Sequence, residues 1–155
     1  MPEKETVRRA RADKRAGKSS STQAGEFVRE EIHHVREGKH GARSTKQAIA
    51  IGLSKARRAG VKLPPGRGAK STTRKSAESA SRASRRRTRP SSRRSRAVRS
   101  ALKREGRSAA SRKALSRQAS SAARRRSAAS RSAAARKAAR TRKRHSTGRR
   151  RRASD

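Results

Sequence analysis

Hydrophobic residues large enough to build a core are concentrated in one stretch of the chain, residues 20–65. This stretch holds the only Phe, all three Ile and two of the four Leu. Outside it, the apolar positions are mostly Ala and do not repeat as a continuous stripe. We therefore expect this stretch alone to specify a structure.

The first half of the stretch predicts a helix over residues 22–37. An S-x-x-Q capping pattern begins at Ser20, with Ser21 or Thr22 as alternative caps, and Gly38 can end the helix in the left-handed conformation. Glu31 interrupts the apolar stripe. The stripe consists of Ala24, Phe27, Val28, Ile32 and Val35, and the opposite polar side of Glu26, Arg29, Glu30, His33 and Glu37.

The second half predicts another helix over residues 45–59, between a second S-x-x-Q pattern at Ser44 and a terminating Gly60. Its inward stripe is Ala48, Ile49, Gly52, Leu53 and Ala56. The small residues at 48, 52 and 56 would let the first helix approach closely. The short connection 38–43 contains two glycines, which favours an antiparallel helical hairpin.

Ile51 falls off the inward stripe of the second helix. It is either a single exposed residue or part of a second contact surface, through which the hairpin would form a weak homo-oligomer.

The flanks of the hairpin have no comparable pattern. Residues 2–18 are compatible with a short helix but have no face to bury, so residues 1–19 should form a frayed basic arm. Pro64 and Pro65 end the hairpin core, residues 20–65. Residues 66–155 are rich in Arg, Ser and Ala, and their like charges should keep them extended until a polyanion binds. The expected fold is all-α, a small helical hairpin with the remainder largely disordered.

Charge sharpens this picture. The chain has 155 residues with 49 Lys plus Arg against 10 Asp plus Glu, a net charge of +39, and the segment 66–155 holds 33 of the cations and 3 of the acids. Such a density of cations favours a polyanionic partner, because binding releases condensed counterions from nucleic acid without any reading of bases. With one aromatic residue in the chain, base stacking on aromatic rings cannot be a main mode of binding.

We expect the phosphate contacts to come from the arginine clusters of the tail and from the basic end of the second helix. These residues are Arg85, Arg86, Arg87, Arg93, Arg94, Arg124, Arg125, Arg126, Arg149, Arg150, Arg151, Arg152, Lys55, Arg57 and Arg58.

Candidate catalytic and metal chemistry is sparse. The chain has no Cys, and the pairs Glu30 with His34 and His33 with Glu37, together with His40, match no known zinc signature. Glu26, Glu30 and Glu31 are expected on a solvated face without a pocket. We therefore expect no metal, no cofactor and no enzymatic activity. No apolar run reaches the length of a signal peptide or a membrane span, which predicts a cytoplasmic, nucleoid-associated protein without a membrane partner.

The segment HVREGKHG followed by STKQAIAIGLSKARRAG, within residues 22–63, resembles a family of small, basic, functionally uncharacterised bacterial proteins. The resemblance implies a bacterial origin and a small helical unit, and it brings no catalytic residues. The tail resembles the basic arms of bacterial linker-histone-like proteins and protamines in composition.

These features predict sequence-independent DNA binding and compaction by charge neutralisation. The first alternative is an RNA-binding or ribosome-associated protein that uses the same phosphate chemistry. The second, from a different class, is a protein-interaction module tethered to nucleic acid by the tail. A helix-turn-helix with the second helix in the major groove is also compatible with the pattern, but a scaffold that presents basic arms is favoured.

Overall fold

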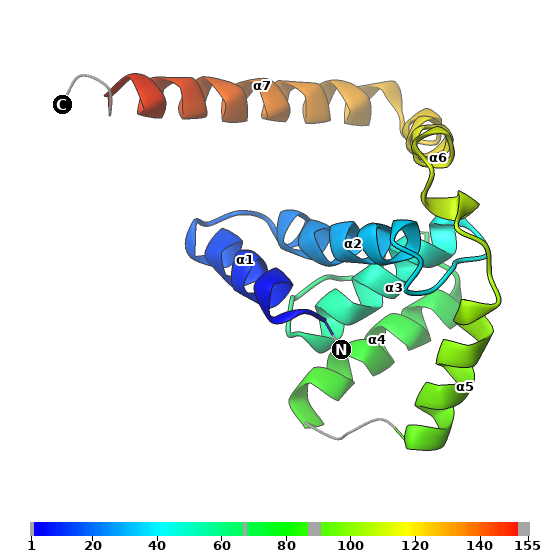
Figure 1. The fold of residues 1–155 in the computed structure, drawn as a ribbon. Coiled ribbons are helices and arrows are strands. Elements are labelled where there is room, and N and C mark those ends of the chain that lie inside the picture. Colours follow the sequence, from blue (N-terminus) through cyan, green and yellow to red (C-terminus); the bar gives the residue numbers. More distant parts are fainter. Residues whose placement is uncertain (1, 67, 87–90, 152–155) are drawn as a thin grey trace. The chain divides into compact units, whose positions relative to one another are not determined.

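The computed structural model describes residues 2–66, 68–86 and 91–151, and this part of the chain is helical without a strand (Figure 1). The chain is divided into two compact units, Met1–Leu115 and Ser116–Asp155. The elements in chain order are α1 (Lys4–Arg15), α2 (Ser20–Arg36), α3 (Thr45–Arg58), α4 (Ser71–Arg86), α5 (Ser92–Lys103), the 3-10 turn η1 (Ser108–Ala110), α6 (Arg112–Arg124) and α7 (Ala128–Arg151).

Helices α2 and α3 form the antiparallel pair at the centre of the first unit. The cap of α2 is Ser19 rather than Ser20, because the Ser19 hydroxyl accepts a hydrogen bond from the Thr22 N–H at 3.4 Å. The cap of α3 is Ser44, whose hydroxyl accepts from the Gln47 N–H at 3.2 Å. Gly38, with a φ of 77°, follows the end of α2 in the left-handed conformation that favours glycine.

The row of small residues on α3 lies against α2. Ala48, Gly52 and Ala56 are all buried. A Cβ atom on Gly52 would lie 2.7 Å from the Cα of Val28 and 3.0 Å from the carbonyl oxygen of Phe27, so only glycine allows this approach. The two backbones are therefore in contact at this point of the hairpin.

Helix α1 packs on α2 and completes one half of the core. Phe27 is fully buried there with Ala10, Ala24 and Ala56. Val7 of α1 joins the rim of this cluster, together with Leu53, Val61 and Leu63. Residues 4–15 are thus an ordered helix, although their two apolar contacts are small. The expectation of a frayed arm is wrong, because α1 packs on α2 and its Val7 and Ala10 join the cluster that buries Phe27.

Residues beyond 65 complete the other half of the core. Ala109 and Ala110 of η1 pack with Ile32, Val35 and Ala48, and Leu115 joins their edge. Two hydrogen bonds hold η1 in place. Thr45 donates its hydroxyl hydrogen to the Ala109 carbonyl at 2.7 Å, and Arg36 Nε donates to the Ala110 carbonyl at 2.8 Å.

The connection between α2 and α3 is held by the segment that follows α5. The N–H of Gly41 donates to the Leu102 carbonyl at 2.8 Å, and the N–H of Ala42 donates to the Gly106 carbonyl at 3.0 Å. A Cβ atom on Gly41 would overlap the carbonyl of Glu105, so this contact also requires glycine. Residues 102–110 therefore clasp the hairpin at its closed end.

The expectation that the remainder is largely disordered around a single hairpin is wrong, since α4 to α7 are helices and α4 packs on α3. Two physical reasons account for this. Ala, Arg, Lys and Leu are strong helix formers, and serines cap the helices: Ser111 accepts from the Ala114 N–H and Ser127 from the Ser130 N–H, both at 3.2 Å. The arginines are on exposed helices, where water and salt screen the repulsion between them.

Candidate nucleic-acid interface

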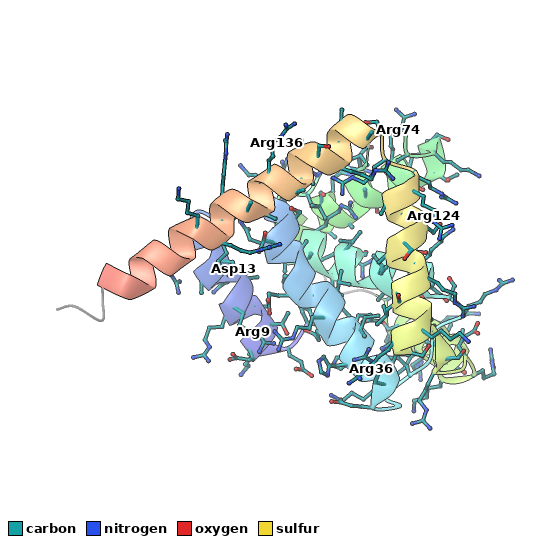
Figure 2. All side chains as sticks on the ribbon, turned by 90° about the horizontal axis from the view of Figure 1, so that it is seen from above. Arg9, Asp13, Arg36, Arg74, Arg124 and Arg136 are labelled. Atoms are coloured by element: carbon teal, nitrogen blue, oxygen red, sulfur yellow. The ribbon has the colours of Figure 1, made fainter. Side chains whose placement is uncertain are left out.

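Helix α7, in the second unit, has the largest net positive charge of the described helices. Helix α7 has 24 residues, of which ten are Lys or Arg and none is acidic. The cationic side chains Arg131, Arg136, Lys137, Arg140 and Arg142 are exposed. Figure 2 shows Arg136 projecting from the helix. At a rise of 1.5 Å per residue the helix is about 36 Å long. It is therefore a cationic rod with no carboxylate of its own to neutralise it.

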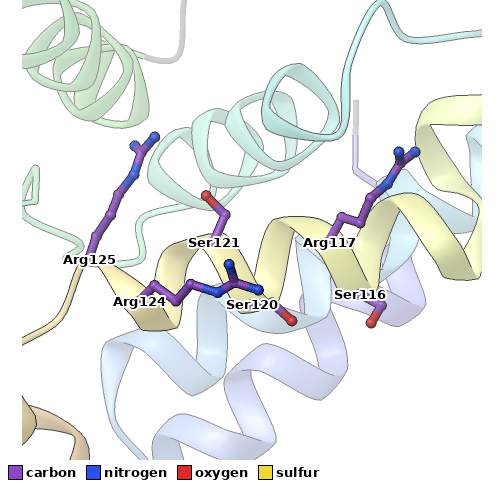
Figure 3. A pocket seen from close by; sticks show the side chains of 6 residues that line it. All are labelled: Ser116, Arg117, Ser120, Ser121, Arg124 and Arg125. Atoms are coloured by element: carbon purple, nitrogen blue, oxygen red, sulfur yellow. The ribbon is translucent and has the colours of Figure 1, made fainter.

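Helix α6 presents a shallow hollow lined by arginine and serine side chains alone (Figure 3). The lining residues are Ser116, Arg117, Ser120, Ser121, Arg124 and Arg125. Arg117 and Ser121 of α6 and Arg125, which directly follows the helix, are spaced four apart and project from the same side. Guanidinium groups and hydroxyls can all donate hydrogen bonds to phosphate oxygens. Arg117 is not among the arginines expected to contact phosphate, although its four-residue spacing from Ser121 and Arg125 is a signal in the sequence.

The expected phosphate contacts come from several elements of the chain. The structure describes seven of these arginines as exposed, on α3, α4, α5, α6 and the connection that follows α6: Arg58, Arg85, Arg93, Arg94, Arg124, Arg125 and Arg126. Arg86 is in α4 and Arg149, Arg150 and Arg151 are in α7, but their side chains are outside the described part of the chain. Arg87 and Arg152 lie outside the described residues.

Lys55 and Arg57 are engaged inside the first unit instead of facing solvent. The Lys55 ammonium lies 3.2 Å from Glu30 Oε1 and 2.7 Å from Glu31 Oε2. Arg57 Nε donates to the Leu63 carbonyl at 3.0 Å. Lys55 is therefore held between two carboxylates, whereas Arg57 uses one of its five N–H donors and keeps its charge.

Glu30 and Glu31 are buried, with 4% and 0% of their surfaces exposed, whereas the sequence predicted a solvated face. Burial acts to raise the pKa of Glu30, but contacts from Thr6, the Glu3 N–H and Lys55 outweigh it and hold this pKa below its usual range. The helical wheel of α2 did not predict this burial, because α1 packs over the side of α2 that was expected to be polar.

Glu31 also forms a cluster with His34 and His40. Each of the three residues offers one potential metal-ligand atom, and these three atoms lie within 4.8 Å of one another. The sequence had paired Glu30 with His34 and His33 with Glu37 instead. Glu31 interrupts the apolar stripe of α2, and an acid at an inward position was the available signal.

No helix in the described ranges is long and apolar enough to cross a membrane. A family model described as a family of unknown function, DUF6496, matches residues 11–67. This match covers the end of α1, all of α2 and all of α3, and its description gives no activity. No curated protein and no solved structure matches the chain. The similarity to this family is therefore limited to the part of the chain that contains the central hairpin. The charged helices α4 to α7 lie outside the match.

Proposed function

We propose that this protein binds nucleic acid, and double-stranded DNA in the first place, through phosphate contacts that do not read base sequence. The observation that carries the proposal is α7, with ten cations and no acid in 24 residues. A duplex has one phosphate charge per about 1.7 Å of axis, so a rod about 36 Å long lies beside roughly twenty phosphates. Its cations can neutralise about half of them and release their counterions.

The arrangement of the cations on α7 fits a groove better than a flat surface. At 100° per residue, Arg131 and Arg142 lie near one side of the helix, while Arg136, Lys137 and Arg140 lie near the other. An α-helix with its side chains is about 10–12 Å across, and the major groove of B-DNA is about 12 Å wide. A helix in this groove has phosphates on both flanks, and cations on both sides of α7 would meet them.

The arginine and serine face of α6 supports the same chemistry. Arginine can bind a phosphate through two parallel N–H donors, and a neighbouring hydroxyl adds a third. No acidic side chain lines the α6 hollow. Such a face fixes a phosphate backbone in place without distinguishing bases.

Base-specific reading has little support. Helix α3, the candidate recognition helix, packs between α2 and α4, and its Lys55 and Arg57 are tied to Glu31 and the Leu63 carbonyl. Phe27, the one aromatic residue of the sequence, is fully buried and unavailable for stacking. Compaction of DNA by charge neutralisation, in the nucleoid, is the role that follows from this proposal.

The proposal is tested by anisotropy titrations of the full chain with random-sequence duplex DNA at several salt concentrations. Replacing five cations of α7 by Gln, at 131, 136, 137, 140 and 142, should reduce the slope of log K against log salt by up to about 4.5. Gln is a good helix former, so α7 should persist. The matched control replaces five exposed cations of the first unit by Gln: Arg11, Lys14, Arg15, Arg43 and Lys46.

If the control lowers the slope as much as the α7 variant, the charge acts diffusely and α7 is not the interface. A slope of only about −1 to −2 for the unmodified chain would contradict phosphate-dominated binding altogether. Titration with duplex RNA of the same length distinguishes DNA binding from the main alternative, RNA binding. The deep, narrow major groove of A-form RNA excludes side chains, so a groove-bound α7 should bind RNA duplexes more weakly.

A further inference from the structure

The carboxylate of Glu31 is buried with too few partners for its charge. Its side chain is 0% exposed and that of Glu30 is 2% exposed, and Lys55 is the cation that contacts both. Glu30 also accepts a hydrogen bond from the Glu3 N–H at 3.1 Å. In the described part of the chain, neither oxygen of Glu31 has a hydrogen-bond partner of good geometry, although Lys55 is close to Oε2. A buried carboxylate in this state is costly, so either a proton or a cation at Oε1 would stabilise it.

The ring of His40 lies next to Glu31 Oε1, and its tautomer can be assigned. His40 Nδ1 lies 3.0 Å from the Gly41 carbonyl oxygen, which can only accept, so Nδ1 carries the hydrogen. Nε2 then faces Glu31 Oε1, 3.3 Å away, and either a proton or a metal ion can lie between the two atoms. Two lone pairs at this distance repel each other unless a positive charge lies between them.

His34 supplies a third potential ligand atom to the same place, and its Nε2 also lies 2.8 Å from Glu3 Oε1. It lies three residues after Glu31 on α2, which puts both on one face of the helix. The His34 and His40 rings are 6.1 Å apart and nearly perpendicular, and their side chains are only 13% and 15% exposed. One carboxylate and two imidazoles therefore converge from two elements, α2 and the connection 38–44.

We propose that Glu31, His34 and His40 bind a divalent transition-metal ion of the zinc type. Two imidazole nitrogens and one carboxylate suit Zn²⁺, whereas Ca²⁺ and Mg²⁺ take shells of oxygen ligands. With ligand bonds of about 2.0–2.1 Å, two ligands of a tetrahedral ion lie about 3.3 Å apart. The His40 and Glu31 atoms already have this separation. The hydrogen bond from His40 Nδ1 to the Gly41 carbonyl orients the His40 ring, and such bonds commonly orient histidine ligands in metal sites.

The ion would join α2 to the connection that residues 102–106 clasp. Gly41 and Ala42 donate their N–H groups to the carbonyls of Leu102 and Gly106. A metal bound at His40 fixes the neighbouring backbone, so it stabilises both the hairpin and the clasp. The three residues leave a fourth position of a tetrahedral ion to water, and the site uses none of the proposed phosphate contacts on α6 and α7.

The test uses the full chain, stripped of nucleic acid and of metal, with Zn²⁺ and Co²⁺ as probes. We expect one ion per chain by calorimetry, the visible absorption of tetrahedral Co²⁺, and a rise in unfolding temperature with Zn²⁺ but not with Mg²⁺. His40→Gln should weaken Zn²⁺ binding by at least about tenfold. The matched control is His33→Gln, because His33 is the exposed neighbour of His34 on the same helix.

The proposal is overturned if the wild-type chain binds neither ion, if Mg²⁺ raises the unfolding temperature equally, or if His33→Gln and His40→Gln weaken binding alike. Glu31→Gln should also abolish the Co²⁺ spectrum. Should that variant fail to fold, as judged by circular dichroism, His34→Gln replaces it, and an unchanged Co²⁺ spectrum in His34→Gln contradicts the site.

Discussion

The Cα atom of Val28 lies so close to Gly52 that a Cβ atom added to Gly52 would stand 2.7 Å from it. The same Cβ would lie 3.0 Å from the Phe27 carbonyl oxygen, which belongs to the backbone of α2 and cannot move aside alone. The separation of α2 and α3 is thus set by the missing side chain of one residue. Every contact that depends on this separation, including the burial of Phe27, depends on Gly52.

Gly52→Ala should therefore destabilise the first unit by roughly 1–3 kcal/mol, the usual cost of overpacking a close contact. The matched control is Gly25→Ala. Gly25 is also inside a helix, but a Cβ atom there would meet nothing within 4 Å, so this change should stabilise α2 by about 0.5–1 kcal/mol. Chemical denaturation of both variants measures the difference. If the two changes have the same sign, the close approach is absent in solution.

Phe27 is the largest side chain of the core, and it is fully buried beneath α1 and against Ala56 of α3. Phe27→Ala should cost about 3–5 kcal/mol, because the small residues around it cannot fill the space it leaves. The comparison is Val98→Ala, since Val98 is 53% exposed and should change stability little. Retention of the wild-type unfolding transition by Phe27→Ala would show that the hydrophobic core lies elsewhere.

The sequence located α2 and α3 because their signals are local. The Ser44 cap, the terminating Gly38 and Gly60, and the four-residue spacing of Ala48, Gly52 and Ala56 can each be recognised within one or two turns. Such signals do not require knowledge of what packs against the helix.

What the sequence did not predict depends on distant partners. Glu31 looked like a break in the stripe of α2, yet Lys55 and His40 cover it from α3 and the connection 38–44. Ala109 and Ala110 looked like part of a featureless tail, and only the hydrogen bonds from Thr45 and Arg36 identify their place. Alanines carry almost no pattern of their own, so their burial depends on contacts that periodicity cannot detect.

The clasp of residues 102–110 on the hairpin predicts that Gly41→Ala loosens a contact remote in sequence. Its Cβ atom would overlap the Glu105 carbonyl, so the segment after α5 must move away. We expect faster amide exchange at Ala42 and Gly41, which lose their bonds to Gly106 and Leu102. Gly106→Ala is the control, because a Cβ at Gly106 would meet nothing within 4 Å. Unchanged protection in Gly41→Ala would mean that the clasp does not form.

The serine cap of α7 predicts how its helicity responds to mutation. Ser127 accepts a hydrogen bond from the Ser130 N–H, and its loss should destabilise the first turn by about 1 kcal/mol. Ser127→Ala should lower the helical circular dichroism of the free protein, whereas Ser132→Ala, inside the helix and exposed, should not. A free protein in which neither change alters the spectrum would indicate that residues 128–151 are not helical before they bind.

Lys55 and Arg58 are one helical turn apart on α3, and we expect their roles to separate completely. Lys55 is 19% exposed in its side chain and compensates two buried carboxylates, so Lys55→Ala leaves Glu30 and Glu31 without their shared cation. Breaking a buried pair in this way typically costs about 3–5 kcal/mol. Arg58 is exposed at the end of α3, so Arg58→Gln should leave stability nearly unchanged and lower the salt slope of DNA binding by at most about 1. Thermal unfolding and salt-dependent anisotropy, measured on both variants, give the two readouts.

If Lys55→Ala folds with wild-type stability but weakens DNA binding, then Lys55 faces phosphates as its sequence context suggested, and the buried arrangement around Glu31 is wrong.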